Sequence, residues 1–276
     1  MTRLRQRVPK FDAKLKAAAK RSLKLAADWA VRNQVTDAWP FWDANRGRFP
    51  YHVLIDRKRR AASKPMWSTC WKTARTVQGL YSAHAVTGKR AYLDAAERGL
   101  DYVATLQFLE PGYERYHGAF REDSPQGPHL AYRDGIEAIQ ALISGYLATG
   151  SERWLRRAVI GADWSLRTFR RRDFPVWLIF PLEGRETSLG WGSAWCFLAG
   201  AIVFAQLAVI TGRKEYVTRG AAPMARRILR NNVLPSGALG IQPEHAQKTH
   251  HTDGASDLAN VLTNDDGLGV ALLATY

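Results

Sequence analysis

The sequence YLATGSERWLRRAVIGADWSL, residues 146–166, contains a Thr-Gly pair that is followed four residues later by Trp-Leu. The same pattern occurs at 87–93 as TGKRAYL and at 211–217 as TGRKEYV, so it recurs every 62 residues. Glycine readily takes the left-handed backbone conformation that ends a helix, and the aromatic-aliphatic pair begins the apolar stripe of the next helix. A repeat of this length and pattern predicts a series of helical hairpins.

The helices on the two sides of Thr-Gly differ in polarity. Those before it, as at 131–149 and 193–211, are apolar nearly all round, whereas those after it are amphipathic. Buried inner helices at 72–87, 131–149, 193–211 and 264–276, surrounded by outer helices at 89–106, 151–169 and 213–231, satisfy both patterns. The sequence therefore predicts an all-α fold, an (α/α) toroid, with a straight solenoid of helix pairs as the structural alternative. Pro223 should kink the last outer helix or mark its real start.

A helix at 11–33 brings the expected number to eight within one domain, residues 1–276. A closed ring of twelve helices at this repeat length needs about 370 residues. We therefore expect an incomplete toroid that ends inside its fourth inner helix. An uncovered apolar helix favours self-association. The residues expected at this open edge are Val270, Leu272, Leu273 and Tyr276.

The composition is that of a globular chain, with 46% hydrophobic and 24% charged residues, which excludes disorder as the main state. The net charge of +15 favours anionic partners. Nucleic acid is not expected because no groove-reading motif accompanies the charge. The longest apolar run, 194–205, is too short to span a bilayer, so no membrane partner is expected. The N-terminus lacks the apolar region of a secretory signal, which favours the cytoplasm.

Neither a cofactor nor a metal site is expected. The two cysteines, Cys70 and Cys196, lie far apart in apolar helical patterns, which excludes a disulfide framework and a cysteine zinc site. His250 lies with three other candidate ligands in EHAQKTHHTDG, but their spacing matches no helical ligand pair or zinc finger. We interpret this segment as a polar loop with one histidine near substrate.

Long linkers at 34–66, 108–130, 172–190 and 233–263 all precede inner helices, so they should gather at one end of the ring, over the helix N-termini. Aromatic and histidine side chains suited to stacking on sugar rings occur throughout them. The alternative is that these side chains only pin the loops onto the ring. They are Trp39, Trp42, Phe49, Tyr51, Tyr113, Tyr116, His117, Phe120, His129, Trp177 and Trp191.

Helix 131–149 carries one polar stripe on an otherwise apolar surface, formed by Arg133, Asp134, Glu137, Gln140 and Ser144. Such a stripe must face a wet cavity or be paired internally, because unpaired buried charges are costly. The first possibility presents Asp134 and Glu137 to a substrate, and the second is an Arg-carboxylate network between inner helices.

A second acidic helix start occurs at 263–268, where Asp266-Gly267-Leu268 echoes Asp134-Gly135-Ile136. A capping box formed by Thr263 and Asp266 is the alternative interpretation. Hydrolysis of a glycosidic bond uses two carboxylates, which two such helix starts could supply.

The hairpin YLATGSERWLRRAVIGADWSL resembles the six-hairpin glycosidase superfamily of (α/α)6 toroids. The stretches YRDGIEAIQALISGYLATG and GWGSAWCFLAGAIVFAQLAVITG look like the corresponding hairpins of unsaturated glucuronyl and rhamnogalacturonyl hydrolases, and the resemblance covers about residues 66–232. It implies that Asp134 is a general acid/base that hydrates an unsaturated uronyl residue, assisted by an acidic residue from a neighbouring hairpin. One repeat earlier the sequence has Lys72 where that partner would be an aspartate. Lys72 could bind a carboxylate or sulfate instead.

These observations predict a glycoside hydrolase-like enzyme that acts on acidic, uronate-containing oligosaccharides by carboxylate acid/base chemistry. The alternatives are a polysaccharide lyase or uronyl epimerase, with Tyr132 or His129 as the base, and a non-catalytic helical-repeat binding protein. The expected catalytic residues are Asp134, Glu137 and Asp266. The expected substrate-binding residues are Lys72, His129, Tyr132, Arg133, Trp42, Trp191, Trp195 and His250.

Overall fold

The structure is a computed structural model that describes residues 12–36, 46–49, 53–56, 61–65, 70–122, 124–125, 127, 129–171, 177–179, 186–187 and 194–231. Helices form most of this part of the chain, as expected. They are α1 (Ala13–Asn33), α2 (Cys70–Thr87), α3 (Arg90–Thr105), α4 (Tyr132–Thr149), α5 (Glu152–Arg171), α6 (Ala194–Thr211), the π-helical segment η2 (Tyr216–Ala221) and α7 (Ala222–Asn231).

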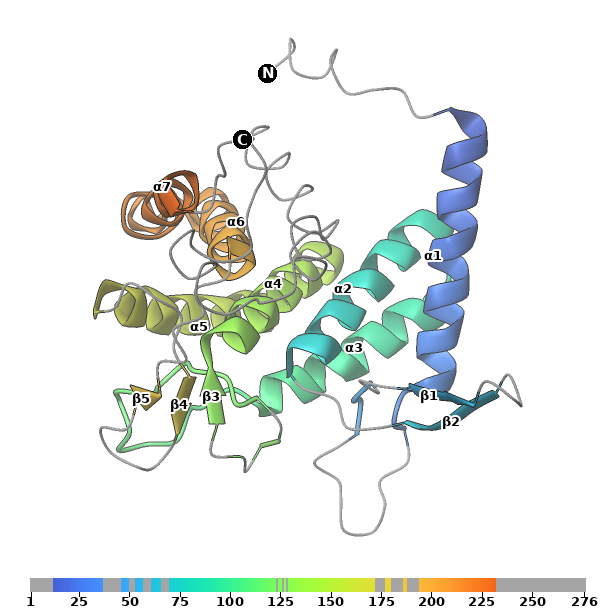
Figure 1. The fold of residues 1–276 in the computed structure, drawn as a ribbon, viewed down its shortest axis with the longest axis horizontal. Helices are drawn as coiled ribbons and strands as arrows, with labels where there is room; N and C mark the ends of the chain where they lie inside the picture. The colour runs from blue at the N-terminus through green and yellow to red at the C-terminus, as the bar shows by residue number, and fades with distance from the viewer. Residues whose placement is uncertain are drawn as a thin grey trace, which may run out of the picture.

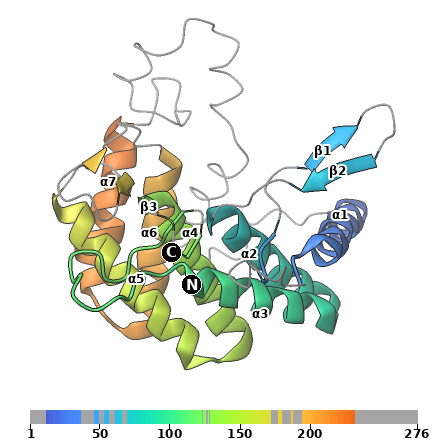
Figure 2. The ribbon, with the colours of Figure 1, turned by 90° about the horizontal axis from the view of Figure 1, so that it is seen from below.

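Three helical hairpins follow one another along an arc, as Figures 1 and 2 show. They are α2 with α3, α4 with α5, and α6 with η2 and α7. The first helix of each hairpin contacts that of the next, which makes α2, α4 and α6 the inner layer. Helix α4 is buried almost continuously from Asp134 to Ile143, whereas α5 exposes Glu152, Arg153 and Arg156. The predicted inner and outer layers are therefore confirmed.

The three Thr-Gly turns share one geometry. In each turn the threonine hydroxyl donates to the carbonyl four residues earlier, at 2.6, 2.7 and 2.6 Å. The backbone N–H two residues after each threonine donates to the same hydroxyl at 3.3 Å. The glycine that follows the threonine has φ of +71° in every case, a conformation that strains any residue with a Cβ. The shared turn geometry confirms the 62-residue repeat. The three glycines are Gly88, Gly150 and Gly212.

Pro223 interrupts the third outer helix, as predicted. The segment η2 precedes it, and the N–H of Ala222 donates to the carbonyl of Val217, five residues earlier. Helix α7 then begins at Ala222, so that Pro223, which has no N–H to donate, lies in its first turn.

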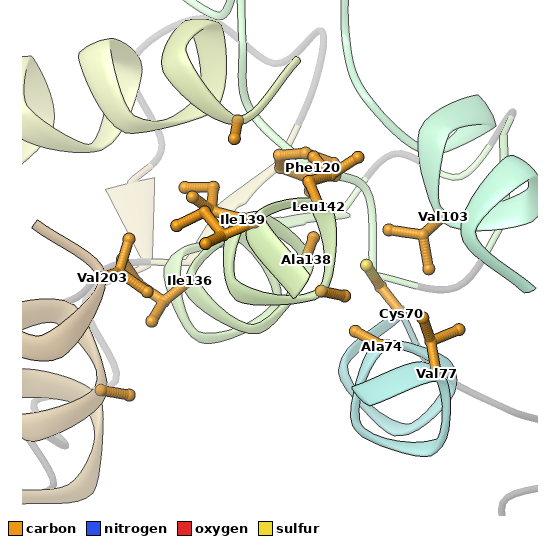
Figure 3. Packing of buried hydrophobic residues seen from close by; sticks show 14 of the residues in the cluster. Cys70, Ala74, Val77, Val103, Phe120, Ile136, Ala138, Ile139, Leu142 and Val203 are labelled. Carbon is orange, nitrogen blue, oxygen red and sulfur yellow. The ribbon is translucent and has the colours of Figure 1, made fainter. Parts of the chain in front are cut away.

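The core runs between the inner layer and the outer layer. Figure 3 shows residues of α2, α4 and α6 packed together with Phe120 of the second linker. Linker aromatics fill places where glycine replaces a larger side chain: a Cβ on Gly161 would lie 2.8 Å from Phe120, and one on Gly99 would lie 2.7 Å from Phe49. Phe49, Tyr116 and Phe120 are all buried. For these three residues the sugar-platform interpretation is wrong, because they pin the linkers onto the helices.

The linkers contain short strands that the sequence analysis did not predict. In the first linker, β1 (Val53–Asp56) pairs antiparallel with β2 (Ala61–Pro65). In the later linkers, β3 (His129–Ala131) pairs antiparallel with β4 (Trp177–Ile179), which pairs with β5 (Glu186–Thr187). The N–H of Cys70, at the start of α2, donates to the carbonyl of Glu122 at 2.6 Å. The linkers before α2, α4 and α6 thus meet at the N-terminal ends of these helices, as predicted, and Figure 1 shows the strands at this end.

The expected fourth inner helix, 264–276, lies outside the described residues together with its open edge, so the expected self-association stays a prediction. Among the helices that the structure describes, none is long and apolar enough to cross a membrane.

Candidate functional site

Polar side chains of α2 and α4 meet near the N-terminal ends of these helices, and we call this contact the α2–α4 polar seam. Its members are Trp71, Lys72, Arg75 and Gln78 of α2 with Asp134 and Glu137 of α4. The apolar positions of α2, such as Cys70, Ala74 and Val77, are turned into the core (Figure 3). The seam residues of α2 occupy adjacent positions around this helix and are half-buried.

Asp134 lies in the first turn of α4 and is fully buried. Its Oδ1 accepts the backbone N–H of Trp71 at 3.0 Å. This N–H belongs to the first turn of α2, where the backbone donors have no partner within the helix. The carboxylate therefore joins two helix N-termini, and both helix dipoles favour a negative charge at this position.

Glu137 is buried one turn further along α4 and lies within reach of two side chains of α2. Arg75 Nε donates to Oε1 at 3.0 Å, and Gln78 Nε2 donates to Oε2 at 3.1 Å. The Arg-carboxylate network between inner helices is thus present at Glu137. It also fixes the guanidinium of Arg75, which is partly exposed to solvent.

Trp71 places an indole ring beside two cations. Lys72 Nζ lies 3.8 Å from the ring centroid, and Arg75 Cζ lies 5.4 Å from it. A cation close to an aromatic face is held there by the ring quadrupole. The seam can therefore offer an aromatic surface for stacking and two positive charges for an anionic group.

Known proteins resemble this chain in structure but not in sequence. No family model and no curated protein sequence matches it. Solved structures do match. A sugar epimerase from a ruminal bacterium superposes with a TM-score of 0.59 at 14% identity, covering 83% of this chain and 59% of the epimerase. The cellobiose 2-epimerase of Spirochaeta thermophila superposes with a TM-score of 0.58 at 17% identity, covering 85% of this chain and 59% of the epimerase. The GH76 α-mannanase of Bacteroides thetaiotaomicron superposes with a TM-score of 0.54 at 14% identity, covering 64% of this chain and 49% of the mannanase.

The described hairpins have the (α/α) toroid fold of these proteins. At 14% to 17% identity these likenesses establish the fold alone. The chain spans 49% to 59% of the length of the three structures. The predicted fold class, an all-α toroid of helical hairpins, is thereby confirmed.

Other predicted site residues lie apart from the seam. His129 is exposed in β3, and its carbonyl accepts the N–H of Glu122 at 2.9 Å. Tyr132 is buried, and its hydroxyl lies 3.9 Å from Met224 Sδ of α7. Its ring packs in the core between α4 and α7, and the expected contact of Tyr132 with substrate stays a prediction.

Six predicted residues have no described side chain. Arg133 belongs to the first turn of α4 and Trp195 to that of α6, and only their backbones are described. The other four lie outside the described residues, so their roles stay predictions. They are Trp42, Trp191, His250 and Asp266.

Sequence reasoning missed Trp71, Arg75 and Gln78. The signal was the repeat itself, because Arg75 stands 62 residues before Glu137 and its hydrogen bond joins repeat-equivalent positions. Trp71 likewise stands 62 residues before Arg133 and 124 before Trp195. Aligning whole hairpins, in addition to the Thr-Gly turns, would have pointed to the seam.

The seam contains no metal-ligand cluster. Across the part of the chain that the structure describes, no group of three or more His, Cys, Asp or Glu residues could hold a metal ion. Cys70 is a buried thiol beneath the seam, with its Sγ 3.8 Å from the carbonyl oxygen of Asp134.

Proposed function

We propose that the chain belongs to a carbohydrate-active enzyme that binds acidic, uronate-containing oligosaccharides at the α2–α4 polar seam and acts on them by hydrolase-type acid/base chemistry. The observation that carries the proposal is the indole of Trp71 beside Lys72 and Arg75, directly next to two carboxylates of α4. The similar solved structures support a saccharide ligand, since they include sugar epimerases and a mannanase.

The seam suits an acidic sugar for two separate reasons. The face of a pyranose ring is apolar and stacks on an aromatic side chain such as Trp71. A carboxylate on that sugar would be attracted to Lys72 and Arg75, and a guanidinium can bind it in bidentate fashion. The overall charge of +15 would also favour encounter with an anionic polymer.

The two carboxylates of the seam have different proposed roles. Glu137 orients Arg75 toward the ligand, because the ion pair fixes the guanidinium. Asp134 is the acid/base, since it lies directly behind the backbone of Trp71. Its burial requires that a bound sugar displace the groups that cover it. Asp266 stays a candidate for the second carboxylate of the reaction.

Epimerisation is the second candidate function, and the two epimerase structures with TM-scores of 0.59 and 0.58 favour it. A polysaccharide lyase with Tyr132 as base has less support, because the hydroxyl of Tyr132 is buried against Met224. The reaction products separate these possibilities, since only epimerisation leaves the substrate mass and linkage unchanged.

The test is an assay of the full chain with unsaturated uronyl disaccharides. Loss of ultraviolet absorbance supports the hydrolase-type reaction, whereas a gain of absorbance on intact polymer indicates a lyase. An Asp134→Asn variant should lose turnover by about 10²-fold or more. The control is Asp101→Asn, which alters an exposed carboxylate that pairs with Arg153. Full activity in Asp134→Asn would contradict the assigned role, and a product of inverted configuration would establish the epimerase instead.

A further inference from the structure

Helix α1 has two apolar faces, and only one of them is packed against the rest of the protein. Leu23, Ala27, Ala30 and Val31 lie on the face that contacts the core. At about 100° per residue, Leu15, Leu25 and Trp29 fall on the opposite face, within about 80° of one another. Their side chains are 51%, 63% and 36% exposed. We call these three residues the α1 outer stripe.

The packed face of α1 is fixed by polar contacts. Asp28 accepts hydrogen bonds from Tyr92 at 2.6 Å and from Lys89 at 3.1 Å, both from the second half of the first hairpin. Gln34, directly after the helix, donates to the carbonyl of Ala95 at 2.9 Å. These contacts hold the helix in one rotation about its axis, so the α1 outer stripe stays turned away from α2 and α3.

Basic side chains lie along one edge of the stripe. The helix carries six cations and one acid, and that acid, Asp28, already pairs with Lys24 and Lys89. Arg21 and Lys14 lie along one edge of the stripe, and both are exposed. Figure 1 shows that the N-terminal turns of α1 extend past the ends of α2 and α3, which makes them accessible to a large flat partner. The cations of the helix are Lys14, Lys16, Lys20, Arg21, Lys24 and Arg32.

We propose that α1 is a peripheral docking helix for an anionic lipid bilayer, with the α1 outer stripe in the interface and its basic residues on the lipid headgroups. An exposed apolar stripe edged by lysine and arginine is what interfacial helices use, and no membrane-spanning segment is needed. The proposal is independent of the saccharide site. It also goes beyond the sequence analysis, which excluded a membrane partner only because no segment could span one.

Charge and apolar exposure together favour this partner over two others. A second copy of the chain would bring its own Lys14 and Arg21 against the same edge of the stripe, which opposes self-pairing. A nucleic acid would engage the cations but would leave Leu15 and Leu25 exposed to water. An anionic bilayer accommodates both kinds of side chain in one contact.

The test is sedimentation of the full chain with vesicles of phosphatidylcholine alone and of phosphatidylcholine mixed with phosphatidylglycerol. We expect binding to the anionic vesicles only, weakening as salt is added. Leu25→Ser should lower the partition coefficient about tenfold, and Arg21→Glu about tenfold or more. The matched controls are Leu229→Ser and Arg230→Glu on α7, where Leu229 is 69% exposed, and these should leave binding unchanged.

Tryptophan fluorescence provides a second measurement of vesicle binding by the folded protein. Addition of anionic vesicles should shift the tryptophan emission of the wild type to shorter wavelength, and Trp29→Phe should reduce that shift. Equal binding to both kinds of vesicle, or equal loss in the α1 and α7 variants, would overturn the proposal. So would binding to a DNA duplex without binding to vesicles, or a dimer in solution that Leu25→Ser dissociates.

Discussion

In the part of the inner layer that the structure describes, two seams occupy the same place in the repeat but differ in chemistry. Between α2 and α4, Arg75 and Gln78 hold the carboxylate of Glu137, and the backbone of Trp71 holds that of Asp134. Between α4 and α6, apolar side chains meet, and Figure 3 shows Ile136 and Val203 directed toward one another. Ala199 of α6 stands at the position that Glu137 occupies in α4 and Arg75 in α2.

This difference indicates that the α2–α4 polar seam is not the most stable way to join two inner helices of this fold. Well-packed apolar residues often stabilise a helix contact as well as buried ion pairs do, or better. The apolar seam shows that apolar packing is available in this architecture. Among the described side chains, polar residues are concentrated in the seam between α2 and α4. This concentration points to a role other than stability, as residues that break a local rule often do.

The largest effect is expected from making the apolar seam polar. Ile136→Asp would place an unpaired carboxylate among apolar side chains and should lower the free energy of unfolding by about 4 kcal/mol or more. Denaturant titration measures this change. Ile136→Val is the size control and should lose only about 1 kcal/mol. A loss below about 1 kcal/mol in Ile136→Asp would show that water reaches this seam.

Breaking the polar seam should have a smaller effect. Glu137→Ala removes the acceptor of both Arg75 and Gln78, and the free energy of unfolding should fall by about 1–3 kcal/mol. The loss is limited because Arg75 is partly exposed and water can solvate it. Glu152→Ala on the exposed start of α5 is the matched control, for which we expect a change within about 0.5 kcal/mol. A neutral Glu137→Ala would mean that the network is not formed in solution.

A double-mutant cycle isolates the pair itself. The coupling of Arg75 and Glu137 should be about 1 kcal/mol, because one partner is buried and the other partly exposed. The exposed pair formed by Arg153 and Asp101 should couple by only about 0.2–0.5 kcal/mol. Equal coupling in the two pairs would remove the distinction between the seam and the surface.

The smallest effect is expected at the surface of α1. Hydrogen bonds from Lys24, Tyr92 and Lys89 hold the pKa of Asp28 well below its ordinary value of 3.8. A lowered pKa in the folded state means that this contribution is fully present above the ordinary pKa and is lost as the pH falls below it. The stability difference between wild type and Asp28→Asn should therefore be constant near neutral pH and shrink in acid. A difference that grows in acid would contradict the sign.

Local signals explain what the sequence could predict. The Thr-Gly turns are set by residues within seven positions of one another, and the inner and outer helices follow from apolar periodicity over one helix. Pro223 acts on its own helix, so its effect was predictable too. Strands β3, β4 and β5 could not be found in this way, because segments of two or three residues carry no usable period and form by pairing between distant linkers.

Tertiary contacts explain what it could not. Phe120 and Tyr132 look like surface aromatics in the sequence, yet Gly161 leaves room for the first and α7 covers the second. The partners of Glu137 lie 62 and 59 residues away, beyond the reach of any helix pattern. Aligning the repeats accounts only for the separation of 62 residues. The sequence therefore predicts the polar stripe of α4 but not both of its partners on α2.

The most direct test of the proposed function is a comparison of binding by calorimetry. The full chain is titrated with an unsaturated uronyl disaccharide and with a neutral disaccharide of the same linkage, in the wild type and in Lys72→Gln. We predict that the wild type binds the uronyl sugar at least about tenfold more tightly, and that Lys72→Gln, which keeps most of the side chain, brings the two affinities close together. Equal affinity of the wild type for both sugars, or a preference that Lys72→Gln leaves intact, would contradict the assignment of the polar seam as the site for the acidic group.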